Sequence, residues 1–238
     1  MDLALAALAY GITVVALVLL ALRVRQLLAV YKKGQPDPTR SGDRGARLKN
    51  MLTEVLGHTK MLNFTGTGIA HWFVMIGFGA LFGTLVTAYG QILNPDFALP
   101  IIGHFAPYEL FTEFIGWATG IGIVTLIGIR QVTRIKKSGR SSRFYGSGSW
   151  KAYYVEATIL AIVFCVTALR GLEGALSEYT SWNWHFALTW PIAAMFKSMS
   201  LDQLHMWVAI VATIKIVVSM TWFIVIASNL TMGVAWHR

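Results

Sequence analysis

The stretch IAHWFVMIGFGALFGTLVTAYGQI, residues 69–92, decides the fold of this chain. It is apolar over a length that matches the hydrocarbon core of a bilayer, so it predicts a membrane-spanning helix. His71 stands just inside the start of this helix. A polar side chain at that depth is either a cofactor ligand or a group at the membrane interface. The question of function therefore begins with what His71 faces.

The composition of the whole chain agrees with a membrane protein. Of its 238 residues, 55% are hydrophobic and only 13% are charged, whereas soluble domains carry about 25% charged residues. The one cysteine, Cys165, excludes a disulfide or an all-cysteine iron–sulfur site within a single chain. The apolar stretch after Met1 has neither a basic start nor a small-residue cleavage pattern, so we expect a retained helix rather than a signal peptide.

The net charge of +9 is distributed unevenly along the chain. Nine Lys and Arg residues fall between Arg23 and Lys60, and seven fall between Arg130 and Lys151, where no acid is present. The other two interhelical segments carry mainly Asp and Glu. This alternation follows the positive-inside rule and predicts an outside N-terminus and a cytoplasmic C-terminus in the cell membrane. Nucleic-acid binding would need one basic soluble surface, and we exclude it.

We therefore predict an all-α integral membrane protein, with residues 1–238 in a single domain built on a five-transmembrane-helix bundle. The five spans are expected at residues 3–22, 69–92, 108–129, 152–172 and 204–230. Apolar residues recur at helical spacing between charges in residues 47–61, which predicts an amphipathic helix on the inner face. The tryptophan-rich segment before the last span predicts a short helix that lies flat at the outer interface.

Two of the six histidines, His71 and His205, lie inside the ends of predicted spans. Neutral imidazole is the usual axial ligand of haem iron, and helix bundles hold haem b between facing helices. The alternative is a contact with lipid headgroups. The two residues lie near opposite membrane faces, about 25–30 Å apart along the membrane normal, so they do not share one iron. The possible second ligands are His58, His237 and Met232 for His71, and His104 and His185 for His205.

Charged residues inside the spans are candidates for quinone binding and proton handling. Lys215 lies near the middle of the last span, where a lysine is costly unless it faces the bundle interior. Its expected partners are Glu113, Glu156, a haem propionate or a quinone oxygen. Glu113 lies four residues after Glu109 near the outer end of its span; we favour exposure at the interface over a proton or cation site for this pair. Glu156 is either a proton-handling carboxylate or an exposed side chain near Lys151.

Three strings carry a resemblance to a known family: IAHWFVMIGFGALF at residues 69–82, ALPIIGHF at 98–105 and SRFYGS at 142–147. They resemble the N-terminal membrane domain of actinobacterial membrane-bound (Fe-S)-binding reductases. This family includes electron-transfer-flavoprotein:menaquinone oxidoreductases and heterodisulfide-reductase-like subunits. Its membrane domain is similar to the haem b gamma subunit of respiratory nitrate reductase. The resemblance implies electron transfer through haem b, between menaquinone and a cytoplasmic iron–sulfur partner or electron-transfer flavoprotein.

Residue by residue, His71 matches the inner ligand of the family's second span and His205 matches the outer ligand of the fifth. Two ligands that the family leads us to expect are absent, one near Leu81 and one between Phe223 and Asn229. These departures leave a second interpretation open, in which the chain is a haem-free anchor that shapes a quinone pocket for a reductase. A small transporter is a third, disfavoured because the sequence has no internal repeat. The family's cysteine-rich half has no counterpart here, so we expect no iron–sulfur cluster in this chain.

Overall fold

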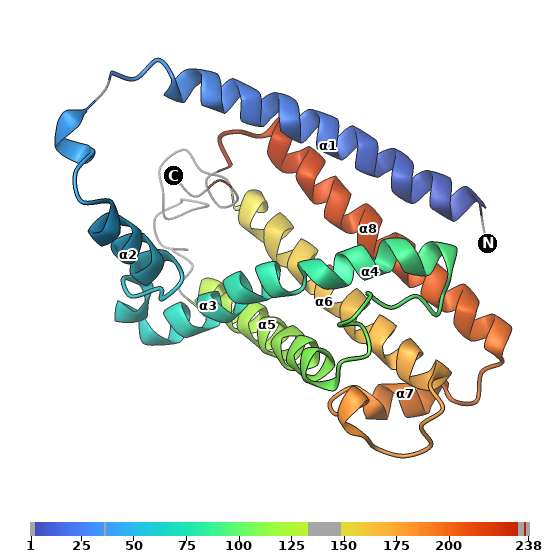
Figure 1. Ribbon diagram of the computed structural model, residues 1–238. Helices are drawn as coiled ribbons and strands as arrows, with labels where there is room; N and C mark the ends of the chain where they lie inside the picture. Colours follow the sequence, from blue (N-terminus) through green and yellow to red (C-terminus); the bar gives the residue numbers. More distant parts are fainter. Residues whose placement is uncertain (1–2, 36, 133–148, 233–235, 237–238) are drawn as a thin grey trace.

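The computed structural model describes residues 3–35, 37–132, 149–232 and 236, and over these residues its regular structure is entirely helical (Figure 1). Four helices are each long and apolar enough to cross a membrane. These are α1 (Leu3–Tyr31), α5 (Ala106–Val132), α6 (Trp150–Leu176) and α8 (Leu201–Ser228). The described chain has a fifth candidate span if α3 (Thr65–Ala80) and α4 (Phe82–Leu93), which are bent by 41° relative to each other, count as one. These helices are those of a multi-pass membrane protein.

The bend divides the predicted span at residues 69–92 into α3 and α4. Leu81 stands between the two helices, and the regular bonding pattern changes there: its N–H bonds to the carbonyl of Gly77, while the N–H of Thr84 bonds back to the carbonyl of Leu81. Gly79 and Gly83 flank this point. Glycine lowers the cost of leaving the helical conformation, and sharp kinks commonly occur at such residues.

The other predicted spans occur with shifted ends. The first helix continues well past residue 22, to Tyr31. Shorter helices occupy the connections: η1 (Pro38–Arg40), α2 (Arg44–Val55), η2 (Met61–Asn63), η4 (Trp184–Phe186) and α7 (Trp190–Phe196). Every residue of α2, the amphipathic helix expected at residues 47–61, is exposed in the isolated chain. The short helix expected before the last span is α7, which packs against α6, while η4 packs against α5.

Small residues bring the helices close together. α1 packs along α8 (Figure 1), with its buried positions Ala6, Ala9 and Ala16 in contact with the core. α3 packs against α5, where a Cβ atom on Gly77 would overlap the hydroxyl of Thr119. That hydroxyl is itself held by a 2.6 Å bond to the carbonyl of Ile115. Helices in membranes associate through such close van der Waals packing, because lipid supplies little hydrophobic driving force between them.

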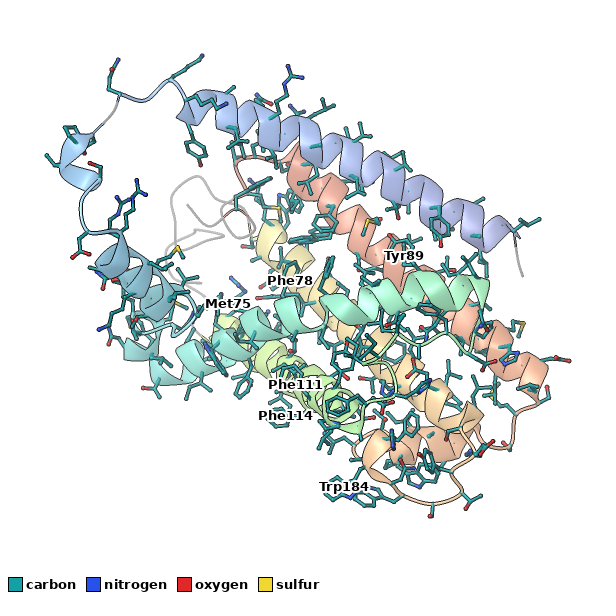
Figure 2. The ribbon with its side chains drawn as sticks, viewed as in Figure 1. Met75, Phe78, Tyr89, Phe111, Phe114 and Trp184 are labelled. Atoms are coloured by element: carbon teal, nitrogen blue, oxygen red, sulfur yellow. The ribbon has the colours of Figure 1, made fainter. Side chains whose placement is uncertain are left out.

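The outer surface of the bundle is apolar. Phe111 and Phe114 of α5 are 46% and 52% exposed, and Phe78 of α3, whose ring lies 5.4 Å from that of Trp222, is 58% exposed (Figure 2). Val14 on α1 is 63% exposed. Large apolar side chains in such numbers on a protein surface mark contact with a membrane or another protein. Here they fit contact with membrane lipid.

The close approach of α3 and α5 gives a testable stability difference. We expect Gly77→Ala to destabilise the protein by about 1–3 kcal/mol, because the new methyl group has to displace Thr119 from a packed helix crossing. Gly128→Ala in the partner helix α5 is the matched control, since a Cβ atom there meets nothing within 4 Å. It should be neutral or stabilising by up to about 1 kcal/mol through helix propensity. Unfolding in detergent measures both changes, and equal effects would contradict the close crossing.

Candidate functional site

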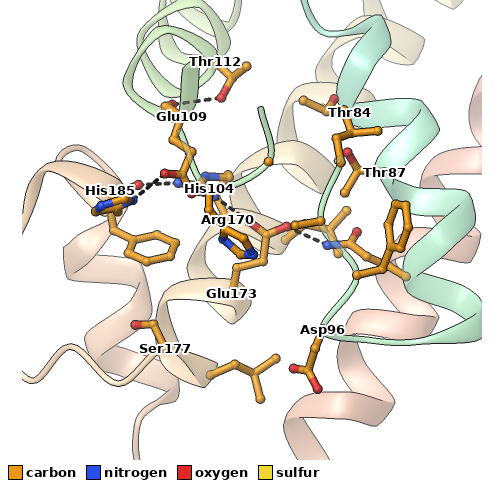
Figure 3. A pocket seen from close by; sticks show the side chains of 18 of the residues that line it. Thr84, Thr87, Asp96, His104, Glu109, Thr112, Arg170, Glu173, Ser177 and His185 are labelled. Atoms are coloured by element: carbon orange, nitrogen blue, oxygen red, sulfur yellow. Dashed lines mark hydrogen bonds and ion pairs between the residues drawn. The ribbon is translucent and has the colours of Figure 1, made fainter. Parts of the chain in front are cut away.

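A cavity of about 470 Å³ lies between α4, α5, α6 and α8, with η4 at one side (Figure 3). Its wall combines apolar side chains with five charged ones: Glu109, Arg170, Glu173 and Lys215 from the helices and Asp96 from the connection between α4 and α5. Ligand pockets typically have this size and pair apolar surface with a few convergent polar groups. This cavity is therefore the candidate functional site.

Arg170 is the centre of a buried ionic cluster beside the cavity. Its Nη1 lies 2.6 Å from Glu173 Oε2 and 3.4 Å from Glu109 Oε1, and its Nε lies 3.4 Å from Glu113 Oε1. Its Nη2 donates to the backbone carbonyl of His185. The side chain is only 11% exposed. A charge in such an environment requires opposite charges and hydrogen bonds to offset its desolvation.

Two of these carboxylates also hold neighbouring elements in place. Glu173 Oε1 accepts a 2.6 Å bond from Gln91 Nε2, which joins α6 to α4. Glu113 accepts a 2.8 Å bond from the N–H of Leu188 and a further bond from the hydroxyl of Thr189. These bonds tie the segment between η4 and α7 to α5. The cluster thus positions four elements around the cavity.

The third carboxylate, Glu109, pairs with a histidine. Its Oε2 lies 2.5 Å from His185 Nδ1. The ring of Tyr179 stacks on that of His185, with centroids 5.4 Å apart and 19° between the planes. The His185 side chain is 29% exposed and that of Glu109 is 5% exposed. The pair therefore joins the buried cluster to the surface (Figure 3).

Lys215 reaches the cavity from α8. It is 1% exposed, as expected for a lysine that faces the bundle interior. Its Nζ donates 2.8 Å bonds to the carbonyl and hydroxyl oxygens of Thr84, just after the bend between α3 and α4. An ammonium group has three N–H donors, and Thr84 accepts from two of them. The structure thus pairs Lys215 with Thr84 rather than with Glu113 or Glu156. Glu156 instead accepts a 2.6 Å bond from Arg130 Nε.

One expectation about acidic residues is wrong, and one alternative considered for Glu156 does not hold. Glu109 and Glu113, expected at the interface, are 4% and 2% exposed. Glu156 is 5% exposed and pairs with Arg130 rather than lying open beside Lys151. The reason is that each acid lies within reach of an arginine on another helix, and pairing with it offsets the cost of burial. The sequence analysis did not assign Gln91, Arg170 or Glu173 to the site. Arg170 could have been found from its position, because an arginine within the apolar span of α6 indicates a buried partner.

At the other end of α3, the structure brings His71 together with His58. His71 Nδ1 lies 2.8 Å from His58 Nε2, and the two rings are stacked with centroids 5.0 Å apart. A haem iron between two imidazoles would need their nitrogens about 4 Å apart, twice a metal–imidazole bond of ~2 Å. In this arrangement the pair is hydrogen bonded to itself and does not fit an iron. Of the other ligands considered, Met232 is buried and His237 lies outside the described residues.

The second haem site expected from the sequence is not assembled in the described residues either. The partner of His205 is Asp96, whose Oδ2 lies 3.5 Å from His205 Nε2. His185 is bonded to Glu109, and His104 borders the cavity. Among the residues that the structure describes, no group of three or more His, Cys, Asp and Glu side chains is placed to hold a metal ion. Figure 1 places the start of α8, which carries His205, and α3, which carries His71, at different ends of the bundle.

The buried cluster predicts a large effect of substituting its central cation. Arg170→Gln should destabilise the protein by about 3–5 kcal/mol, because it leaves buried carboxylates without their partner. Lys60→Gln is the control: Lys60 makes a 2.8 Å pair with Glu54, but its side chain is 75% exposed. Loss of such a surface pair costs at most about 1 kcal/mol. Unfolding in detergent compares the two variants, and a small effect of Arg170→Gln would contradict a structural role for the cluster.

Comparison of the chain with protein-family models, with curated proteins and with solved structures gives no match. The resemblance to membrane-bound reductases therefore depends on the three sequence strings alone, and what it implies about function is a proposal.

Proposed function

We propose that this chain is a membrane subunit of a quinone-linked oxidoreductase and that the cavity binds a quinone headgroup, such as that of menaquinone. The observation that supports this most directly is a cavity of about 470 Å³ among apolar helices that contains the buried ammonium group of Lys215. A quinone headgroup is flat and largely apolar, and its carbonyl oxygens accept hydrogen bonds. The cavity offers both the apolar surface and the charged donor that such a ligand needs.

Lys215 is the residue that would fix the headgroup. Thr84 holds the ammonium in position through two bonds and leaves one of its three N–H donors for a carbonyl oxygen. Hydrogen bonds from a charged donor contribute about 1.5–3 kcal/mol. Reduction of the quinone consumes two electrons and two protons, and oxidation of the quinol releases them. The carboxylates and the histidine beside Arg170 are the groups that would exchange those protons.

The electrons would come from, or pass to, a cytoplasmic iron–sulfur or flavoprotein partner. This part of the proposal rests on the resemblance and on the single cysteine of the chain, which supplies no cluster of its own. With the basic segments on the cytoplasmic side, as the positive-inside rule predicts, the cavity lies toward the outer face. The partner would then dock at the opposite end, near α2 and the start of α3.

We propose the haem-free form of this subunit, because the described histidines do not fit a haem iron. The specific observation that favours a haem-containing form as a second candidate is that His58 and His71 do face each other. Haem b at the inner end would supply electron transfer toward the partner, and these two residues would be its ligands only after they separate.

A reduced-minus-oxidised spectrum of the purified chain distinguishes the two forms. We expect no α band of haem b after dithionite reduction, because the His58–His71 pair is closed by its own hydrogen bond. A band that disappears in His71→Ala but not in His104→Ala would contradict the haem-free form and assign the haem to the inner end.

The proposed binding role of Lys215 predicts a change in affinity. Lys215→Met keeps the length of the side chain but removes the charged donor, so it should weaken binding of a short-chain naphthoquinone about 10–100-fold. Isothermal titration calorimetry on the protein in lipid nanodiscs measures this, with size-exclusion chromatography and circular dichroism as checks of folding. Lys49→Met is the control, since Lys49 is exposed on α2 and does not border the cavity. Absence of binding by the native chain would overturn the proposed function.

A further inference from the structure

We propose that Glu109 and His185 form the proton-binding site of the cavity, in which His185 takes up one proton from water and holds it against Glu109. One part of this proposal rests on the proposed function: the ligand whose binding is coupled to the proton is taken to be a quinone headgroup. Its observations are independent of that choice: a close carboxylate–imidazole pair, a gradient of exposure across it, and an imbalance of buried charge.

The buried charges around Arg170 do not balance. When Lys215 carries its proton, the described wall of the cavity and the adjoining cluster contain two cations, Arg170 and Lys215, and the three carboxylates that surround the guanidinium. With His185 neutral, these groups carry a net charge of −1. An uncompensated charge in a low-dielectric site is costly. One proton on His185 brings the net charge to zero.

The other titratable groups that face the cavity do not correct this imbalance. They are Tyr108 from α5, Tyr179 from the segment before η4, and His104 and Asp96 from the connection between α4 and α5. Tyrosine hydroxyls are uncharged near pH 7. The side chain of Asp96 is 61% exposed, and His104 is exposed as well, so water solvates both. Lys215 bonds to Thr84, whereas the Glu109–His185 pair is in direct contact with Arg170, so protonation of this pair sets the charge next to the guanidinium.

The geometry of the pair suits transfer between water and the cluster. The His185 side chain is 29% exposed, so it is accessible to water, whereas that of Glu109 is 5% exposed. The 2.5 Å contact between Nδ1 and Oε2 joins them, and the other oxygen of Glu109 lies 3.4 Å from Arg170 Nη1. Figure 3 shows this chain of contacts along one side of the cavity. Tyr179 stacks on the imidazole, and an aromatic face stabilises a cationic ring.

This arrangement links ligand charge to proton uptake. A cluster with a net charge of zero binds an anion better than one with a net charge of −1. An anionic ligand should therefore bind together with up to one proton, and the coupling is reciprocal. A ligand that gains negative charge in the cavity, as a quinone does on reduction, would draw the same proton from His185.

Calorimetry in two buffers of different ionisation enthalpy counts the protons taken up with each ligand. The probe is a hydroxynaphthoquinone whose hydroxyl is already ionised at the assay pH, slightly above neutrality. We expect the native chain to take up a substantial fraction of one proton per ligand. His185→Gln should take up much less than the native chain, because the imidazole is gone. Glu109→Gln should also take up much less, because one carboxylate fewer remains to hold a proton on His185.

Asp202→Asn is the control, because Asp202 is an exposed acid at the start of α8 that does not border the cavity. It should match the native proton count. The proposal is overturned if the native chain takes up no proton, or if either cluster variant keeps the native count.

A second measurement needs no ligand. The thermal midpoint of the native chain should fall as the Glu109–His185 pair loses its proton, because that proton stabilises the folded state. A series of midpoints at rising pH should show a much smaller change for Glu109→Gln than for the native chain. Failure of every quinone probe to bind would overturn the proposed function alone, since this pH dependence still decides for or against the proton site. An equal pH dependence in both proteins would overturn the proton site.

Discussion

The burial of Arg170 in an apolar helix is the constraint on which the site depends. A guanidinium at that position is stable only if carboxylates reach it, and the structure supplies them from two helices, Glu109 and Glu113 from α5 and Glu173 from α6 itself. The pairing fixes the rotation of α5 against α6. Because Glu113 also binds the segment that leads into α7, the same cation determines how that segment covers the end of the bundle.

A second polar contact keeps the opposite wall of the cavity in place. Lys215 binds the carbonyl of Thr84 next to the bend between α3 and α4, so α8 is joined to the broken span at the point where its helical bonding is interrupted. Lys215 and Arg170 are both committed to partners on the walls. Neither side chain fills the space between them, and this helps to explain why a cavity persists among tightly packed helices.

Hydropathy and charge were sufficient to predict the class of protein and the approximate location of its long helices, because both depend on composition over about twenty residues. The bend at Leu81 and the partners inside the bundle were not predictable in this way. Helical periodicity places Glu113 on a face of its own helix, but it does not say how that helix is rotated against α6. The partner of Lys215 is a backbone carbonyl with its own hydroxyl, a combination that leaves no signature in the sequence pattern. Arg170 was the one missed residue with a clear signal, since an arginine inside an apolar span requires a reason.

His71, at the start of α3, lies at the end of the bundle that offers fewer free polar groups for a ligand. A ligand site needs space and polar groups whose bonding is not already complete. His71 and His58 bond to each other directly, and Glu156 is bonded to Arg130, whose side chain is 42% exposed. At the other end, three carboxylates face two cations around an open cavity, and a histidine in contact with water completes the cluster. Among the described residues, space, a charged donor and an unbalanced charge occur together only there. The cavity beside Arg170, rather than the end of the bundle that holds His71, is therefore the favoured functional site.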